Sequence, residues 1–244
     1  MKKESLYIGC SGFYNNDWKG SLYPDNAQSK DFLTLYSQTF NCVEINSTFY
    51  RKPTAKTLLK WHDETPDDFR FFIKIPKVIS HEKRLKDCRE EVSAFCDHIA
   101  EHLKEKLSGF LYQFPPSFKH TPENLDLIFS NLDFRWVNVI EFRHNSWWHE
   151  DLFNILNENN IIFSGVSFPG NLPEEMIINH PDILYYRLHG QPVLYKSEYS
   201  QDYIDDVAEK ILKAQKKAFI FFNNTWGTAA IHNALYLKKV LKGG

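Results

Sequence analysis

The residues of this chain that are best suited to chemistry follow short apolar segments of the sequence. Six such segments end in charged, imidazole or amide side chains. These are Glu44, Asn46, Lys74, Gln113, Glu141, Arg143, Arg187, His189, Asn223 and Asn224. A charged group beside a buried apolar segment is costly unless it is paired or reaches water. Because buried ionisable clusters are frequently functional, we interpret this set as one candidate site.

Glu44, Glu141 and His189 are the candidate catalytic residues, because carboxyl and imidazole groups act as general acids and bases. The positive side chains would hold an anionic substrate, since arginine can bind phosphate through two parallel hydrogen bonds. The candidate substrate-binding residues are Asn46, Tyr50, Lys74, Gln113, Arg143, Trp147, Arg187, Asn223 and Asn224. The first hypothesis is a hydrolase for a phosphate-containing or nucleic-acid substrate, cleaving a phosphodiester bond or a glycosidic bond flanked by the two carboxyl groups.

A metal-dependent phosphodiesterase or isomerase is one alternative, with Glu44, Glu141 and His189 as oxygen and nitrogen ligands. Three nearby cations and the absence of HxH and HExxH spacings argue against it. We therefore expect no cofactor and keep a divalent metal as the alternative.

Two further explanations need no catalysis. In a nucleic-acid or small-anion binding protein, aromatic side chains such as Tyr50 and Trp147 would stack on bases or sugars. In a purely structural explanation, Glu44 and Glu141 would pair with the lysine and arginine side chains as a polar plug. The sequence excludes neither the binding function nor the structural explanation.

Eight apolar, β-rich segments would position these residues. They are 6–11, 42–47, 71–76, 109–114, 137–143, 161–166, 184–189 and 219–223. Amphipathic stretches that predict helices lie between most of them, over 29–40, 91–107, 124–132, 152–157, 204–214 and 229–241. Thr121 followed by Pro122 is typical of a helix start.

This alternation predicts an α/β fold, a TIM-like (β/α)8 barrel formed by one domain over residues 1–244. Residues 168–182 contain three prolines, which leaves open an irregular sixth βα unit. The competing open, doubly wound sheet has no GxGxxG motif to support it. Alternate strand residues share a face, so Glu44 and Asn46 should point inward while Val43 and Ile45 face the helices. Active sites of such barrels lie at the carboxyl ends of the strands.

Composition excludes several classes of protein. Lys and Arg total 29 against 31 Asp and Glu, so a protein that coats nucleic acid through general positive charge is not expected. The four cysteines form no CxxC motif, which suits a reducing cytoplasm. No segment approaches 18 apolar residues, so we expect no membrane span. The oligomeric state is not specified.

Several ordered motifs resemble the YecE-like family, also called domain of unknown function 72. They are IGCSGFYNNDWKGSLYP, VEINSTFYRKP, FFIKIPKVISH, LYQFPPSF, IEFRHNSWW, YYRLHG and FFNNTWGTAAIHNA. The resemblance implies a TIM-barrel fold and no assigned reaction. The residues of this chain that match the motifs of the family are Trp18, Tyr23, Pro24, Glu44, Asn46, Phe49, Tyr50, Lys74, His81, Gln113, Pro115, Glu141, Arg143, Trp147, Arg187, His189, Gly190, Asn223 and Asn224. Many relatives have an acidic residue after strand six, where this chain reads FSGVSFPG.

Overall fold

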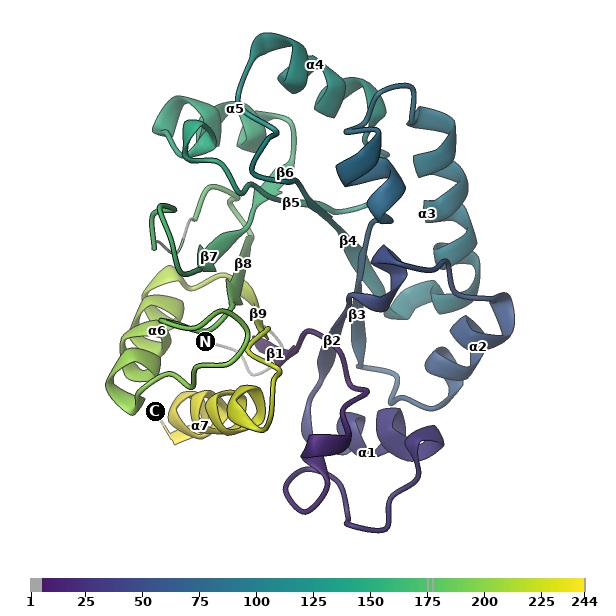
Figure 1. Ribbon diagram of the computed structural model, residues 1–244, viewed down its shortest axis with the longest axis vertical. Helices are drawn as coiled ribbons and strands as arrows, with labels where there is room; N and C mark the ends of the chain where they lie inside the picture. Colours follow the sequence, from purple (N-terminus) through teal and green to yellow (C-terminus); the bar gives the residue numbers. More distant parts are fainter. Residues whose placement is uncertain (1–5, 175, 177, 244) are drawn as a thin grey trace.

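Parallel strands lie at the centre of the molecule, and α-helices surround them (Figure 1). The computed structural model describes residues 6–174, 176 and 178–243. The strands are β1 (Leu6–Cys10), β2 (Cys42–Ile45), β3 (Arg70–Lys74), β4 (Leu107–Gln113), β5 (Asn138–Glu141), β6 (Ile161–Phe163), β7 (Gly165–Ser167), β8 (Ile183–Leu188) and β9 (Lys217–Phe222). The helices are α1 (Phe32–Thr39), α2 (Ala55–Asp63), α3 (Arg89–Leu103), α4 (Pro122–Asn131), α5 (Glu150–Glu158), α6 (Gln201–Ala214) and α7 (Ala229–Gly243).

The strands form two parallel sheets rather than one continuous sheet. One sheet has the order β2-β3-β4-β5-β6 and the other the order β1-β9-β8-β7. The arrangement is a TIM-like α/β fold in which the backbone ladders do not close into a complete barrel. The prediction of parallel strands alternating with helices is therefore confirmed, and the predicted closure is not seen.

Side chains replace the missing ladder between β1 and β2. The Tyr36 hydroxyl accepts a hydrogen bond from Cys10 N (2.7 Å) and donates one to Cys42 O (3.0 Å). The Asn41 amide accepts from Ile8 N (3.2 Å) and donates to Leu6 O (2.7 Å). A Cβ at Gly9 would lie 2.1 Å from Cys42 O, so only glycine permits this close approach. We call this contact, made by Tyr36 and Asn41, the β1–β2 seam.

The second break lies within the sixth apolar segment. It forms two three-residue strands, β6 and β7, which Ser164 separates. Ser164 N donates to Ile140 O of β5, whereas His189 N after β8 donates to Ser167 O of β7. The segment thus changes its partner midway from β5 to β8. No helix is described between residues 168 and 182, apart from positions 175 and 177, which agrees with an irregular sixth unit.

Capping explains where several helices begin. The hydroxyls of Thr54, Thr121 and Ser200 accept hydrogen bonds from Thr57 N, Asn124 N and Tyr203 N at the starts of α2, α4 and α6. The prediction at Thr121-Pro122 is confirmed. Helix α2 is absent from the sequence-based set, although Leu58 and Trp61 give it a buried face.

The inward and outward faces of the strands follow the predicted alternation. Val43, Ile45, Ile140, Phe142 and Leu188 belong to the large cluster shared with the helices. A separate cluster fills the space enclosed by the strands, and it contains Cys42, Phe72, Leu111, Val139, Ile162, Tyr185, Phe219 and Phe221. In the described part of the chain, no helix has the length and apolarity needed to cross a membrane.

Candidate functional site

The candidate site lies directly beyond the enclosed apolar cluster, at the carboxyl ends of the strands. Glu44, Lys74, Gln113 and Arg187 each lie two positions after a member of that cluster: Cys42, Phe72, Leu111 and Tyr185. The strand register also sets Gln113 beside Glu141. Alternation along each strand therefore directs all these side chains into the same interior.

Arg187 holds the deepest carboxylate of the site. Its Nε donates to Glu44 Oε2 (2.8 Å) and its Nη2 to Glu44 Oε1 (2.6 Å), which is a bidentate pair. Tyr185 and Ser11 donate their hydroxyls to the same carboxylate, both at 2.7 Å. Glu44 and Arg187 are completely buried, so these four donors replace water around Glu44.

Glu141 is the second buried carboxylate, and Arg187 reaches it as well. Arg187 Nη1 donates to Glu141 Oε2, and Arg143 Nε donates to Glu141 Oε1. One guanidinium thus connects two carboxylates from β2 and β5. The third neighbour of Glu141 is His189, whose Nε2 lies 3.1 Å from Oε2.

Both carboxyl groups are held ionised. Burial raises their pKa, but the positive charge of Arg187 at Glu44, and of Arg143 and Arg187 at Glu141, outweighs it. The pKa of Glu44 is therefore lowered and that of Glu141 lies well below its usual range. Neither group holds the proton that a general acid would donate at neutral pH.

His189 is a neutral imidazole. Burial, followed by the nearby Arg143 charge, lowers its pKa to about 3. Asn223 Nδ2 lies 2.9 Å from His189 Nδ1, so Nδ1 accepts and Nε2 carries the proton that is donated to Glu141. Arg143 Nη2 lies 3.2 Å from His189 Nε2. Because His189 Nε2 carries a proton, both atoms are donors, and the Arg143 Nη2 hydrogens remain available to another acceptor.

Lys74 differs from the arginines because no carboxylate in the described part of the chain pairs with it. Its Nζ donates to Gln113 Oε1 (2.7 Å) and lies 4.3 Å from the centroid of the Phe49 ring. Burial, followed by the Arg187 charge, lowers the pKa of Lys74 to about 7. At neutral pH a substantial fraction of this lysine is therefore the free amine.

The outer layer of the site has hydrogen-bonding groups to spare. Asn46, Gln113 and Asn223 are half-buried, and the Arg143 side chain is 6% exposed. Asn46 Oδ1 is buried without a hydrogen bond. In the described part of the chain, no hydrogen bond involves Arg143 Nη1 or Gln113 Nε2. The Arg143 guanidinium lies 4.0 Å from the centroid of the Phe168 ring, which fixes its plane.

Two of the residues predicted to bind substrate, Trp147 and Asn224, contact other parts of the protein, and a third, Tyr50, lies at the surface after β2. Trp147 is fully buried among Phe118 and Phe142 and donates Nε1 to Phe118 O (2.7 Å), so it belongs to the core. Asn224 is buried and donates to Ser197 O and Asn233 Oδ1, so it connects the end of β9 to the loop after β8 and to α7. Tyr50 is 84% exposed and has no contact with the buried carboxylates.

Sequence reasoning missed the residues that complete the site from within. Tyr185 and Ser11 bind Glu44, while Phe49 and Phe168 cover Lys74 and Arg143. Tyr185 could have been found, because it precedes Arg187 by two positions and so shares its face. Nothing in the spacing of Phe168 indicates its contact with Arg143.

The proposed metal ligands are arranged unfavourably. Arg187 lies between Glu44 and Glu141 and uses oxygen atoms of both. Within the described ranges, no group of three or more His, Cys, Asp or Glu side chains is placed to hold a metal ion.

Comparison with known proteins identifies the family. Residues 7–244 match the family described as "Protein of unknown function DUF72". The UPF0759 protein YunF of Bacillus subtilis (strain 168) is 27% identical over 275 residues, covering 97% of this chain and 94% of YunF. The UPF0759 protein YecE of Escherichia coli (strain K12) is 36% identical over 101 residues, covering 41% of this chain and 36% of YecE.

Solved structures agree. The crystal structure of a DUF72 family protein from Thermotoga maritima MSB8 matches with a TM-score of 0.86 at 31% identity, covering 97% of this chain and 98% of that one. A DUF72 family protein from Enterococcus faecalis V583 has the same fold, with a TM-score of 0.82. The resemblance expected from the sequence motifs is confirmed, and the chain belongs to the DUF72 family.

Proposed function

We propose that this protein is an enzyme that binds a phosphate-bearing small molecule at the carboxyl ends of its strands. The observation that carries the proposal is the contrast between the two layers of the site. In the buried layer, both carboxylates are fully paired. In the outer layer, Arg143 and Gln113 retain N–H groups that face no acceptor among the described residues, and an anion would supply the missing acceptors.

The charge balance also favours an anion. Glu44 and Glu141 contribute two negative charges, and Arg143 and Arg187 contribute two positive charges. Lys74 adds a third positive charge when it is protonated. The fold gives independent support, because sites of complete (β/α)8 barrels occupy this end of the strands.

Of the reactions considered from the sequence, hydrolysis by a carboxylate pair fits the site least well. Cleavage of a glycosidic bond needs one protonated carboxyl group as the acid. The pKa of both Glu44 and Glu141 is lowered by arginine, and Glu44 is enclosed by four donors. We therefore assign these carboxylates to holding Arg187 and Arg143, and we place the chemistry among the outer groups.

Titration with inorganic phosphate tests the proposal. We expect calorimetry to detect binding of phosphate to wild type. Arg143→Leu should weaken binding at least about tenfold, since a charged hydrogen bond contributes about 1.5–3 kcal/mol. Arg135→Leu removes an exposed arginine that precedes β5, at the opposite end of the strands, and should have no effect. Equal binding by both variants would refute the assignment.

A nucleic-acid strand is the second candidate, favoured by exposed aromatic side chains at the same end of the molecule. Tyr14, Tyr50 and Trp226 follow β1, β2 and β9 and are 66%, 84% and 69% exposed. Bases stack on such rings, and phosphate contacts make binding salt-dependent. Salt-dependent binding of a short oligonucleotide, weakened by Trp226→Ala but not by Phe134→Ala, would favour this candidate. Phe134 is also exposed but precedes β5.

A further inference from the structure

Two lysines among the described residues are almost completely buried, and their surroundings differ. Lys106 is 2% exposed, and its Nζ donates to His62 O (2.5 Å), Thr65 O (2.6 Å) and Thr65 Oγ1 (3.4 Å). Three acceptors match the three N–H groups of an ammonium, so Lys106 serves the structure as a cation. Lys106 is therefore the buried lysine with which Lys74 is compared.

Lys74 is 8% exposed and has a single hydrogen-bond acceptor, the neutral amide oxygen of Gln113. In the part of the chain that the structure describes, no carboxylate lies within ion-pair distance of its Nζ. The nearby carboxylates of Glu44 and Glu141 are already paired with Arg187 and Arg143. A buried ammonium without a partner is unfavourable, so this arrangement favours the uncharged amine.

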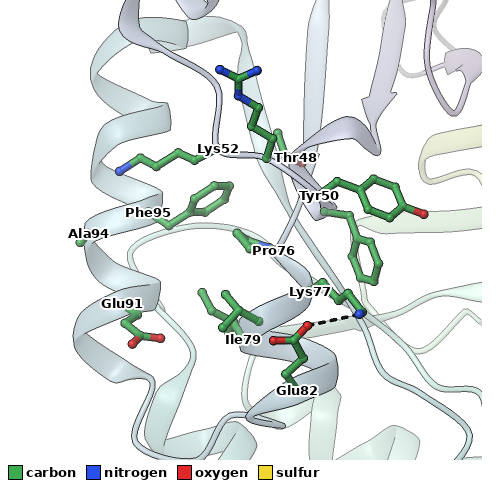
Figure 2. Close-up of a pocket in the computed structure, with 13 residues that line it drawn as sticks. Thr48, Tyr50, Lys52, Pro76, Lys77, Ile79, Glu82, Glu91, Ala94 and Phe95 are labelled. Carbon is green, nitrogen blue, oxygen red and sulfur yellow. Dashed lines mark ion pairs between the residues drawn. The ribbon is translucent and has the colours of Figure 1, made fainter.

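A groove lies near this amine, on a wall that includes Phe49, and Lys74 is not among the residues that line it. The cavity has a volume of about 520 Å³ and is lined by side chains that follow β2 and β3 and by α3. Figure 2 shows Thr48, Tyr50, Pro76 and Lys77 around it. Phe49 also lines the cavity, and the same ring lies 4.3 Å from Lys74 Nζ. The Thr48 hydroxyl donates to Lys74 O (2.6 Å), so the wall of the groove is fixed to the strand that carries the lysine.

We propose that Lys74 Nζ is a nucleophile that forms an imine with the carbonyl carbon of an aldehyde or ketone substrate. An uncharged lysine amine has a lone pair, and desolvation is one way in which proteins activate lysine for this reaction. The assignment of the substrate as a phosphate-bearing carbonyl compound rests on the proposed function, with Arg143 and Gln113 holding the phosphate. Lys74 Nζ then reacts with the carbonyl carbon of the same substrate.

The step balances without an oxidant or reductant. The Nζ lone pair forms a C–N bond to the carbonyl carbon, and the carbonyl π electrons move to the oxygen. That oxygen takes up protons from Nζ and from solvent and leaves as water, which gives an iminium ion. The Phe49 ring, 4.3 Å from Nζ, lies where it would stabilise that positive charge.

Reductive trapping tests the proposal on the folded, full-length chain. The protein is incubated at pH 7 with glycolaldehyde phosphate and sodium cyanoborohydride, and the modified lysines are identified by peptide mass spectrometry. We expect Lys74 to be modified at least ten times faster than Lys77, which is exposed and lines the same groove. Lys77→Arg should retain the fast modification, and Lys74→Arg and Lys74→Met, both checked by circular dichroism, should lose it. Modification of Lys74 no faster than Lys77 in the folded wild type would overturn the proposal.

A second probe separates this proposal from the proposed function. Glycolaldehyde has the same carbonyl group without phosphate. If Lys74 reacts equally fast with both probes and inorganic phosphate does not compete, the nucleophile is supported and the phosphate-binding assignment fails. If inorganic phosphate binds as expected but neither probe modifies Lys74, the phosphate assignment is supported and the imine is refuted.

Discussion

Arg187 and Glu44 form a bidentate ion pair across 143 positions of sequence, with Nε and Nη2 donating at 2.8 and 2.6 Å. Both side chains are completely buried. The pair joins β8 of one sheet to β2 of the other, so it connects two sheets that share no complete backbone ladder there. Glu44 therefore acts as the anchor of Arg187.

Replacement of Arg187 by Met should strongly destabilise the protein. It leaves Glu44 without a counter-ion and Glu141 with only Arg143, and breaking a buried pair from one side costs about 3–5 kcal/mol. Urea denaturation measures the change in the free energy of unfolding. Lys60→Met, which removes an exposed pair with Glu64, should cost less than about 1 kcal/mol. Similar small losses in both variants would contradict the role of Arg187.

Acid should destabilise the protein in two stages. Unfolded His189 takes up a proton near its ordinary pKa of about 6.5, whereas the buried residue resists until about pH 3, so stability falls as the pH drops below about 6.5. The pKa of Glu44 and Glu141 is lowered in the folded state. Their contribution is complete above the unfolded pKa of about 4.3 and is lost as the pH falls below it.

His189→Gln separates the two stages. In urea denaturation at a series of pH values, this variant should lose less stability than wild type between about pH 6.5 and 4.3, while the steeper loss below remains. His149→Gln alters an exposed histidine and should follow the wild-type curve. Parallel curves for wild type and His189→Gln would show that His189 titrates normally.

Lys74→Met should increase stability at neutral pH by about 1 kcal/mol, as is common when a functional group is replaced by a better packed one. In wild type, the folded pKa of Lys74 is about 7 and its ordinary value is 10.5, so the unfolded chain binds more protons between these values. Stability due to Lys74 therefore rises with pH from about 7 to 10.5. The advantage of the variant over wild type should therefore fall and then reverse over this range, with Lys77→Met as the exposed control.

Tyr36→Phe tests the β1–β2 seam. The change leaves Cys10 N and Cys42 O without their hydrogen-bond partner in a buried position. An unsatisfied buried group costs about 1–3 kcal/mol. Chemical denaturation should show this loss, together with faster amide exchange in β1. The matched variant Tyr236→Phe removes a hydroxyl that bonds the exposed Asp205 at 3.3 Å and should change stability little. Equal effects would mean that the seam does not depend on Tyr36.

Sequence periodicity predicted where the strands lie and which way their side chains point. The alternation of polar and apolar residues around Glu44, Glu141 and Arg187 was sufficient to predict that these side chains point inward. A strand has a period of two, and its apolar face must pack against the helices. The start of a helix could also be predicted where a capping residue is present, as at Thr121, because the capping hydrogen bond joins residues that are close in sequence. Helix α2 was missed although Thr54 caps it and Leu58 and Trp61 share its buried face.

The sequence by itself determined the parallel α/β pattern, the inward direction of the polar residues and membership of the DUF72 family. Only the tertiary structure decided that Arg187 pairs with both carboxylates, that Lys74 donates to the Gln113 amide oxygen, and that Trp147 belongs to the core. The physical reason is that pairing and pKa depend on distances of a few ångströms between side chains from different strands. Residue type and spacing determine the face of a strand but not these distances.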